Sequence, residues 1–128
     1  DEKRQNFVLE LPARLTPVKA AVFPLVNDQK MVRIARKVFS QLKKEFNLVY
    51  DESGSIGRRY SRQDEIGTPF CITIDEKSIK NKDVTVRDRD TTKQIRVKIS
   101  DLKDVLIKLI NGEIVFEKAG KVVETRVK

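Results

Sequence analysis

Histidine is absent from the 128-residue sequence, and Cys71 is the only cysteine. Imidazole and thiolate groups supply most zinc ligands and activate most serine and cysteine nucleophiles, so these classes of site are excluded. No disulfide can form within the chain, which suits a reducing compartment and predicts a cytoplasmic protein. Because Cys71 lies inside the apolar run FCITI, we expect a buried, unreactive thiol.

Two further absences narrow the possible functions. No run approaches the roughly 18 apolar residues of a membrane span, and no secretory signal opens the chain, so no membrane partner is expected. The segment SGSIG has the small residues of an anion-binding turn, but it matches neither glycine-rich nucleotide fingerprint. A plain loop with a helix cap is the preferred interpretation. Since Met31 is the only methionine, the chain looks processed or cut from a longer polypeptide.

Carboxylates occur as adjacent pairs, Asp64-Glu65 and Asp75-Glu76. Neighbouring side chains on a helix or strand point in different directions, so neither pair suggests acid–base catalysis. Asp64 is instead expected to pair with an arginine of its own helix. We therefore expect no catalytic residue, no metal and no cofactor in the chain.

Positive charge is what the sequence has in excess. Lys and Arg total 27 against 19 Asp and Glu, a formal net charge of +8. Such a balance is typical of proteins that bind polyanions, although a basic domain with no such partner fits it equally well. The length suits one domain, and 39% hydrophobic residues suffice for a core.

The hydrophobic pattern alternates between the periods of strands and helices. It predicts strand, helix, strand, helix and strand, then a hairpin and a last helix, at 18–26, 27–46, 47–50, 55–67, 69–74, 84–87 with 94–99, and 100–112. Right-handed crossovers should make the first three strands parallel. The fold class is therefore α/β, a single domain with about five strands. Residues 1–17 form a lead-in, 18–112 the domain, and 113–128 a charged extension that the pattern does not place.

Several helix ends carry recognisable signals. Asn27 or Asp28 suits the N-cap of the first helix, Ser100 that of the last, and Gly67 the end of the second. The first helix has a basic outer face that is expected to be solvated. The inward residues of the second helix are predicted to be Ile56, Tyr60 and Ile66.

Two clusters of basic residues are candidate functional sites. Arg58, Arg59 and Arg62 lie within about one helical turn, where like charges four apart repel and call for compensation. The hairpin interleaves arginine and aspartate in the run RDRD, residues 87–90. Arginine suits phosphates and base edges, and aspartate can accept from the exocyclic amine of cytosine. Cross-strand ion pairs that stabilise a turn remain the structural alternative.

Two segments, SGSIGRRYSRQDEIGTPF (53–70) and TVRDRDTTKQIR (85–96), with the lead-in LTPVKAAVFPLVND, resemble the C-terminal anticodon-binding domain of class II glycyl-tRNA synthetases of the archaeal and eukaryotic type. The resemblance covers about Leu11 to Gly112. It implies a mixed, mainly parallel sheet with helices on both faces. It also implies binding of the anticodon loop of glycine tRNA, beside a separate upstream catalytic domain that holds ATP and magnesium.

The same resemblance implies that this chain alone does not aminoacylate, that the parent enzyme is a homodimer and that the fragment is a monomer. Glycine anticodons share two cytosines, for which Asp88 would be the acceptor and its arginine neighbours the donors. The cluster of Arg58, Arg59 and Arg62 would contact phosphates or the loop beside the hairpin. The RNA-binding candidates are Arg58, Arg59, Arg62, Arg87, Asp88, Arg89, Gln94 and Arg96. The alternative is an anticodon-binding-like module that serves protein contacts or nonspecific nucleic-acid binding.

Overall fold

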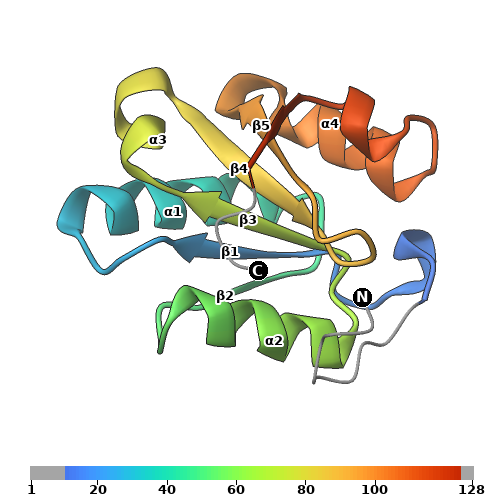
Figure 1. Ribbon diagram of the computed structural model, residues 1–128, viewed down its shortest axis with the longest axis horizontal. Coiled ribbons are helices and arrows are strands. Elements are labelled where there is room, and N and C mark those ends of the chain that lie inside the picture. Colours follow the sequence, from blue (N-terminus) through green and yellow to red (C-terminus); the bar gives the residue numbers. More distant parts are fainter. Residues whose placement is uncertain (1–10, 125–128) are drawn as a thin grey trace.

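A computed structural model describes residues 11–124 and builds them around one mixed sheet (Figure 1). Within these residues, six strands lie in the order β2-β1-β3-β4-β5-β6. The strands are β1 (Ala20–Pro24), β2 (Leu48–Tyr50), β3 (Phe70–Ile74), β4 (Asp83–Asp88), β5 (Gln94–Lys98) and β6 (Lys121–Val123). The helices are α1 (Gln29–Leu42), α2 (Ile56–Ile66), α3 (Glu76–Asn81) and α4 (Ile99–Ile110), with short 3₁₀ turns at Ala13–Leu15 and Phe116–Lys118.

The sheet combines a parallel half with an antiparallel half. Strand β1 pairs in parallel with both β2 and β3, which confirms the predicted parallel core. Strands β3, β4, β5 and β6 then pair antiparallel in succession. The α/β fold with helices on both faces is confirmed. The antiparallel share exceeds the expectation because β6, from the segment that the pattern did not place, extends the hairpin by one strand.

Helices α1 and α4 cover one face of the sheet through apolar stripes. Helix α1 begins after Asp28, whose carboxylate accepts from the backbone N–H groups of Lys30 and Met31, as one of the two predicted caps. The core on this face also contains Phe116, which is 8% exposed. The extension from residue 113 therefore contributes to the same core. No helix within residues 11–124 is long and apolar enough to cross a membrane.

Helix α2 covers the other face (Figure 1). A small apolar cluster there joins Tyr60 to Ala21, Phe23 and Cys71. Burial raises the pKa of the Cys71 thiol to about 12, in line with the expected inert thiol. Tyr60 points inward as predicted, but Ile66 is 55% exposed, so that prediction is wrong. Six residues of helix rotate the chain by about 240°, which places Ile66 on a different side from Tyr60.

Two predicted helix boundaries need correction. Helix α4 begins at Ile99 with Lys98 as its N-cap, so Ser100 lies inside the first turn and caps nothing. Helix α3 was not predicted at all. Its N-cap is Asp75, which forms a capping box with Ser78, and a carboxylate between a strand and a serine three residues later was the available signal. Gly67, with φ 82°, ends α2 as expected.

Candidate nucleic-acid interface

The hairpin turn between β4 and β5 is held together by its own polar side chains. One Asp88 oxygen accepts from the backbone N–H of Thr91 at 3.2 Å and from its hydroxyl at 2.8 Å. Thr92 takes a left-handed conformation with φ 63°. No described residue other than Thr91 donates a hydrogen bond to the Asp88 carboxylate. Burial raises the pKa of Asp88, and the hydrogen bonds from Thr91 offset only part of that effect.

Arg89 ties the hairpin to two other segments. Its side chain is 3% exposed and donates to the carbonyl oxygen of Gly67 at 2.8 Å and to that of Leu11 at 2.6 Å. It also pairs with the Asp90 carboxylate at 2.9 Å. The turn, the end of α2 and the lead-in are therefore fixed relative to one another. Arg89 acts here as a clamp, with its guanidinium turned into the protein.

Arg87 is also committed to the interior. Its guanidinium makes a bidentate pair with Asp64 of α2, at 3.0 and 3.3 Å, and lies 4.7 Å from the centre of the Tyr60 ring. Both side chains of the pair are at most 7% exposed. Burial would lower the pKa of Arg87, but the hydrogen bonds and charge of Asp64 raise it. The expected pairing of Asp64 within its own helix is wrong, because Asp64 faces the sheet.

Gln94 and Arg96 lie across the hairpin from β4, as predicted. Gln94 is opposite Arg87, and Arg96 is opposite Thr85. Gln94 is 1% exposed, whereas Arg96 bridges the carboxylates of Asp75 and Asp83. These two acidic partners were not foreseen, since they come from the end of β3 and the start of β4. Arg87 and Gln94 thus lie side by side in a polar layer that Asp64 of α2 completes, whereas Arg96 belongs to a separate ion-pair cluster with Asp75 and Asp83.

The three arginines of α2 have separate environments. Arg59 is 2% exposed and donates to the backbone carbonyls of Pro24 and Asp51, at the ends of β1 and β2, and to that of Gly54 in the loop before α2, at 3.2 Å. Arg62 pairs with Asp51 at 2.8 Å. Arg58 is exposed, and no ion pair of its side chain is found within residues 11–124. The repulsion expected between them is relieved because Arg59 turns inward and Arg62 meets a carboxylate.

The arginine cluster does not flank the hairpin turn. Arg59 contacts the carboxyl ends of β1 and β2, whereas Arg89 of the hairpin contacts Gly67, at the other end of α2. Eight helical residues separate these points, which corresponds to about 12 Å. The expectation that Arg58, Arg59 and Arg62 lie beside the hairpin is therefore wrong. A role for them in RNA binding stays a prediction, with Arg58 the most accessible.

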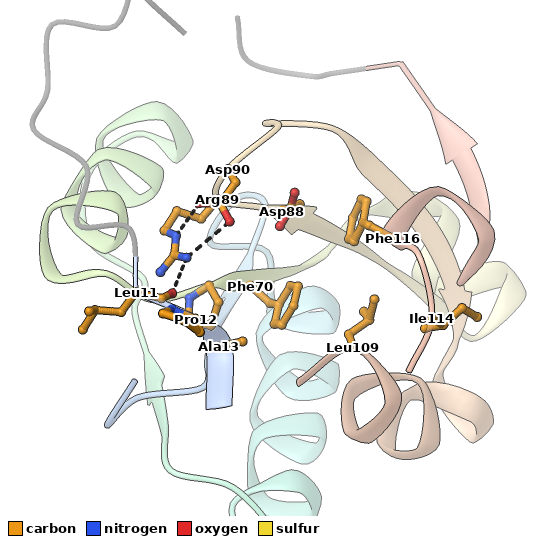
Figure 2. Close-up of a pocket in the computed structure, with 11 residues that line it drawn as sticks. Leu11, Pro12, Ala13, Phe70, Asp88, Arg89, Asp90, Leu109, Ile114 and Phe116 are labelled. Carbon is orange, nitrogen blue, oxygen red and sulfur yellow. Dashed lines mark hydrogen bonds and ion pairs between the residues drawn. The ribbon is translucent and has the colours of Figure 1, made fainter. Parts of the chain in front are cut away.

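A pocket of about 450 Å³ opens beside the hairpin turn (Figure 2). Phe70 and Phe116 form its apolar floor, with nearly parallel rings whose centres are 6.4 Å apart. Asp88 and Asp90 lie on its rim, and Figure 2 shows Asp88 between Asp90 and Phe116. Its volume fits a small planar ring, and its rim offers acceptors. This pocket could not be predicted from the sequence pattern, because Phe116 belongs to the segment whose position was not predicted.

Of the eight predicted site residues, the structure brings Arg87, Asp88, Arg89 and Gln94 together at the hairpin. Arg87, Arg89 and Gln94 are buried, and only Asp88 of this group lines the pocket with a carboxylate that has acceptor capacity left. Arg96 lies further along β5, and the α2 arginines lie elsewhere. The arrangement can present an acceptor above an aromatic floor, held by buried arginines.

Comparisons with known proteins agree with this architecture. The family described as "Anticodon binding domain" matches residues 19–109. The glycine–tRNA ligase of Rhodopirellula baltica is 54% identical over 95 residues, which is 74% of this chain and 18% of that protein. The glycine–tRNA ligase of Bacillus cereus is 52% identical over 109 residues, which is 85% of this chain and 23% of that protein. The chain spans about a fifth of the length of these relatives.

A solved structure confirms the fold. Prolyl-tRNA synthetase from Cryptosporidium parvum, crystallised with halofuginone and AMPPNP, superposes with a TM-score of 0.75 at 23% identity. The match covers 81% of this chain and 23% of that protein. At this identity the likeness concerns the fold alone. The family matches residues 19–109, which contain most of the sheet and nearly all of the four helices. The chain therefore belongs to the anticodon-binding domain family.

Proposed function

We propose that this chain is the tRNA-recognition part of a glycine–tRNA ligase and that it binds the anticodon loop of glycine tRNA. The observation that carries the proposal is the identity of about half of the aligned residues to proteins named glycine–tRNA ligase, over 74% to 85% of this chain. The net charge of +8 supports it, because RNA is a polyanion.

Amino-acid activation then belongs to a part of the ligase outside this chain, together with ATP, magnesium and the dimer contact. This chain alone should bind RNA without aminoacylating it, as a monomer and in the cytoplasm. The relatives named above are bacterial, so assignment to the archaeal and eukaryotic type of the enzyme stays a prediction from the motifs.

The proposed readout places an anticodon cytosine in the pocket beside the hairpin. The N4 amine of cytosine is a donor, and a carboxylate is its natural acceptor. Asp88 offers such an acceptor at the rim, while Phe70 and Phe116 provide apolar contact below. A donor that reaches Asp88 would also stabilise its carboxylate and so oppose the desolvation that raises the pKa of this group.

Arg87 and Arg89 take a supporting part in this proposal. Arg89 fixes the turn that carries Asp88, and Arg87 fixes β4 against α2. Their guanidinium groups are already hydrogen-bonded inside the protein, so they position the reading residue and need not touch a base. Exposed basic side chains such as Arg58 would meet phosphates, which position RNA without reading its sequence.

The experiment that tests the proposal is a salt titration of binding to a glycine-tRNA anticodon stem-loop. A second stem-loop, with both anticodon cytosines replaced, is titrated in parallel. A preference for the cytosine loop that persists as salt rises supports base readout, because phosphate contacts weaken with salt in both loops alike. Equal affinities that fall together would contradict it and favour a basic surface without anticodon specificity.

A pair of variants locates the readout. Asp88→Ala should weaken binding of the cytosine loop by about 1 to 3 kcal/mol and leave the substituted loop nearly unchanged. Lys43→Ala is the control, because Lys43 is exposed at the C-cap of α1, where its ammonium group lies over the Phe39 ring. Equal losses on both loops with Asp88→Ala would show that the hairpin does not read bases.

A further inference from the structure

A second hollow lies at the far end of β4 from the hairpin pocket, between α1, α3 and α4. This groove has a volume of about 830 Å³. Its walls are aliphatic, with Ile34 and Val38 from α1, Ile79 from α3, and Ile99 from α4. Ile34, Ile79 and Ile99 are only partly buried although they pack against the core. The groove is therefore a lined apolar surface that the described residues leave open.

The rim of the groove carries one sign of charge. Lys37, Lys82, Lys98 and Lys103 surround it, and none of the described residues that line it is acidic. Lys103 pairs with Glu45 outside the groove at 3.3 Å, and Lys98 donates to the carbonyl oxygen of Asn81. For Lys37 and Lys82, no ion pair is found within residues 11–124. A positively charged rim around an apolar floor is complementary to an occupant with carboxylates and aliphatic side chains.

The backbone of Lys82, a residue of this rim, is strained. It ends α3 in the left-handed conformation with φ 55°, where glycine is the favoured residue. A side chain in this conformation is strained relative to glycine. Backbone strain of this kind is concentrated at binding and active sites, and the side chain of Lys82 lines the groove.

We propose that this groove binds an acidic amphipathic helix of a separate protein, with its aliphatic side chains on the groove floor and its carboxylates against the lysines. Helix-in-groove docking has this form, with anchors spaced three and four residues apart. The proposal goes beyond tRNA binding and does not depend on it.

Other occupants fit the groove less well. No aromatic side chain is among the described residues that line it, so unpaired bases would have no stacking partner there. A second copy of this chain, at +8, would be repelled. The described chain enters at Leu11 beside Arg89, at the other end of β4, seven residues of extended chain or roughly 23 Å from Lys82. A part of the same polypeptide that precedes Leu11 would have to reach across that distance.

The test is a titration of the isotope-labelled 128-residue chain with a helical peptide of roughly 15 residues, built from leucine at helical spacing and flanking glutamates. One control peptide has the leucines replaced by alanine, and another has the glutamates replaced by glutamine. An oligouridylate is the nucleic-acid arm. The expected result is saturable amide shifts at Ile79, Lys82 and Ile99 with the first peptide only, and no shift at Asp88.

Two variants are measured, so that the failure of one of them to fold does not prevent the test. Lys82→Gly removes a rim charge and relieves the strained backbone, so the melting temperature should rise while the peptide binds about fivefold more weakly. Lys82→Glu combined with Lys98→Glu should weaken binding by roughly tenfold or more. Unchanged affinity in both variants overturns the proposal. Absence of saturable shifts with the acidic peptide, or the same shifts with oligouridylate, overturns it as well.

Discussion

The two faces of the sheet are stabilised by different chemistry. On the face under α1 and α4, the strands contribute hydrocarbon side chains such as Ile72, Val84 and Ile95, all with no exposed surface. On the face under α2, the apolar cluster around Phe23 gives way to a polar layer towards the hairpin. There Asp64 pairs with Arg87, and Tyr60 shares a hydrogen bond with Thr73 at 3.1 Å.

The apolar face holds the strands and helices together, whereas the polar face determines how they are aligned. Hydrocarbon contacts stabilise in proportion to buried area and tolerate small shifts. A bidentate ion pair is directional, and it contributes less to net stability than to a unique arrangement of the chain. Register matters here, because a slip of one residue would turn Arg87 to the apolar face. The polar face therefore aligns β4 with α2, and through them the turn that carries Asp88.

The largest expected effect comes from breaking the pair on the polar face. Arg87→Ala removes the guanidinium that meets Asp64 in the interior and leaves a buried carboxylate uncompensated by it. We expect the free energy of unfolding to fall by about 3 to 5 kcal/mol. Urea denaturation of the variant and of the parent chain measures this change.

A matched double variant tests whether alignment or attraction is the main contribution. Replacing Arg87 with Met and Asp64 with Leu removes both charges at nearly constant volume, and we expect most of the lost stability to return. The double variant should nevertheless show weaker discrimination between the two anticodon stem-loops, because the alignment is gone. A double variant as unstable as Arg87→Ala would mean that the pair contributes net attraction.

The second effect concerns the apolar face. Leu106 is 1% exposed, and Leu106→Ala should lower the free energy of unfolding by about 3 kcal/mol through lost burial and a residual cavity. No charge changes, so the loss should be the same at pH 4 and pH 7. Denaturation at both pH values checks this, and a loss that varies with pH would show that the two faces are coupled.

The sequence predicted the apolar face well and the polar face poorly. The stripe Met31, Ala35, Val38 and Leu42 has helical spacing, and all four residues are buried. Local periodicity therefore sufficed to identify that face of α1. The alternation of β3 likewise placed Phe70 and Ile72 in the core. Hydrophobic patterns predict these elements because each residue responds to burial independently of its partner.

Charged residues give no such local signal. Arg87, Arg89 and Asp88 have similar surroundings in the sequence, yet the first two are buried and Asp88 lines a pocket. Their positions depend on partners 22 and 23 residues away, at Gly67 and Asp64. Composition suggested a surface cluster, but long-range pairing decided otherwise. The pocket floor was hidden for the same reason, since Phe116 meets Phe70 across 46 residues.

The third effect is a pH dependence on the polar face. Burial would raise the pKa of Asp75, but hydrogen bonds from Arg96 and Ser78 and the charge of Arg96 outweigh it, so the pKa is lowered. A lowered folded-state pKa gives stability that is present above the unfolded value near 4 and lost as the pH falls through the folded value. Asp75→Asn should cost about 2 kcal/mol at pH 7.

The cost of Asp75→Asn should shrink as the pH falls towards 3, because the parent chain then loses the same charge. Arg96 retains Asp83 as a partner, which limits the loss. Thermal denaturation from pH 3 to pH 7 measures both profiles. A constant difference across this range would contradict the assignment of Asp75 as a charge-dependent contact.

The smallest effect has the opposite sign and concerns Asp88. Burial raises the pKa of Asp88, so its stabilising contribution is present below the unfolded value near 4 and lost as the pH rises through the folded value. Asp88→Asn cannot ionise and should equal or exceed the parent in stability at pH 7, by less than about 1 kcal/mol. The stability difference between Asp75→Asn and the parent chain changes with pH in the opposite direction. The same denaturation series therefore compares the two variants directly. If Asp88→Asn is destabilising at pH 7 by as much as Asp75→Asn, the Asp88 carboxylate serves the fold. It would then not be the acceptor held in reserve for a cytosine.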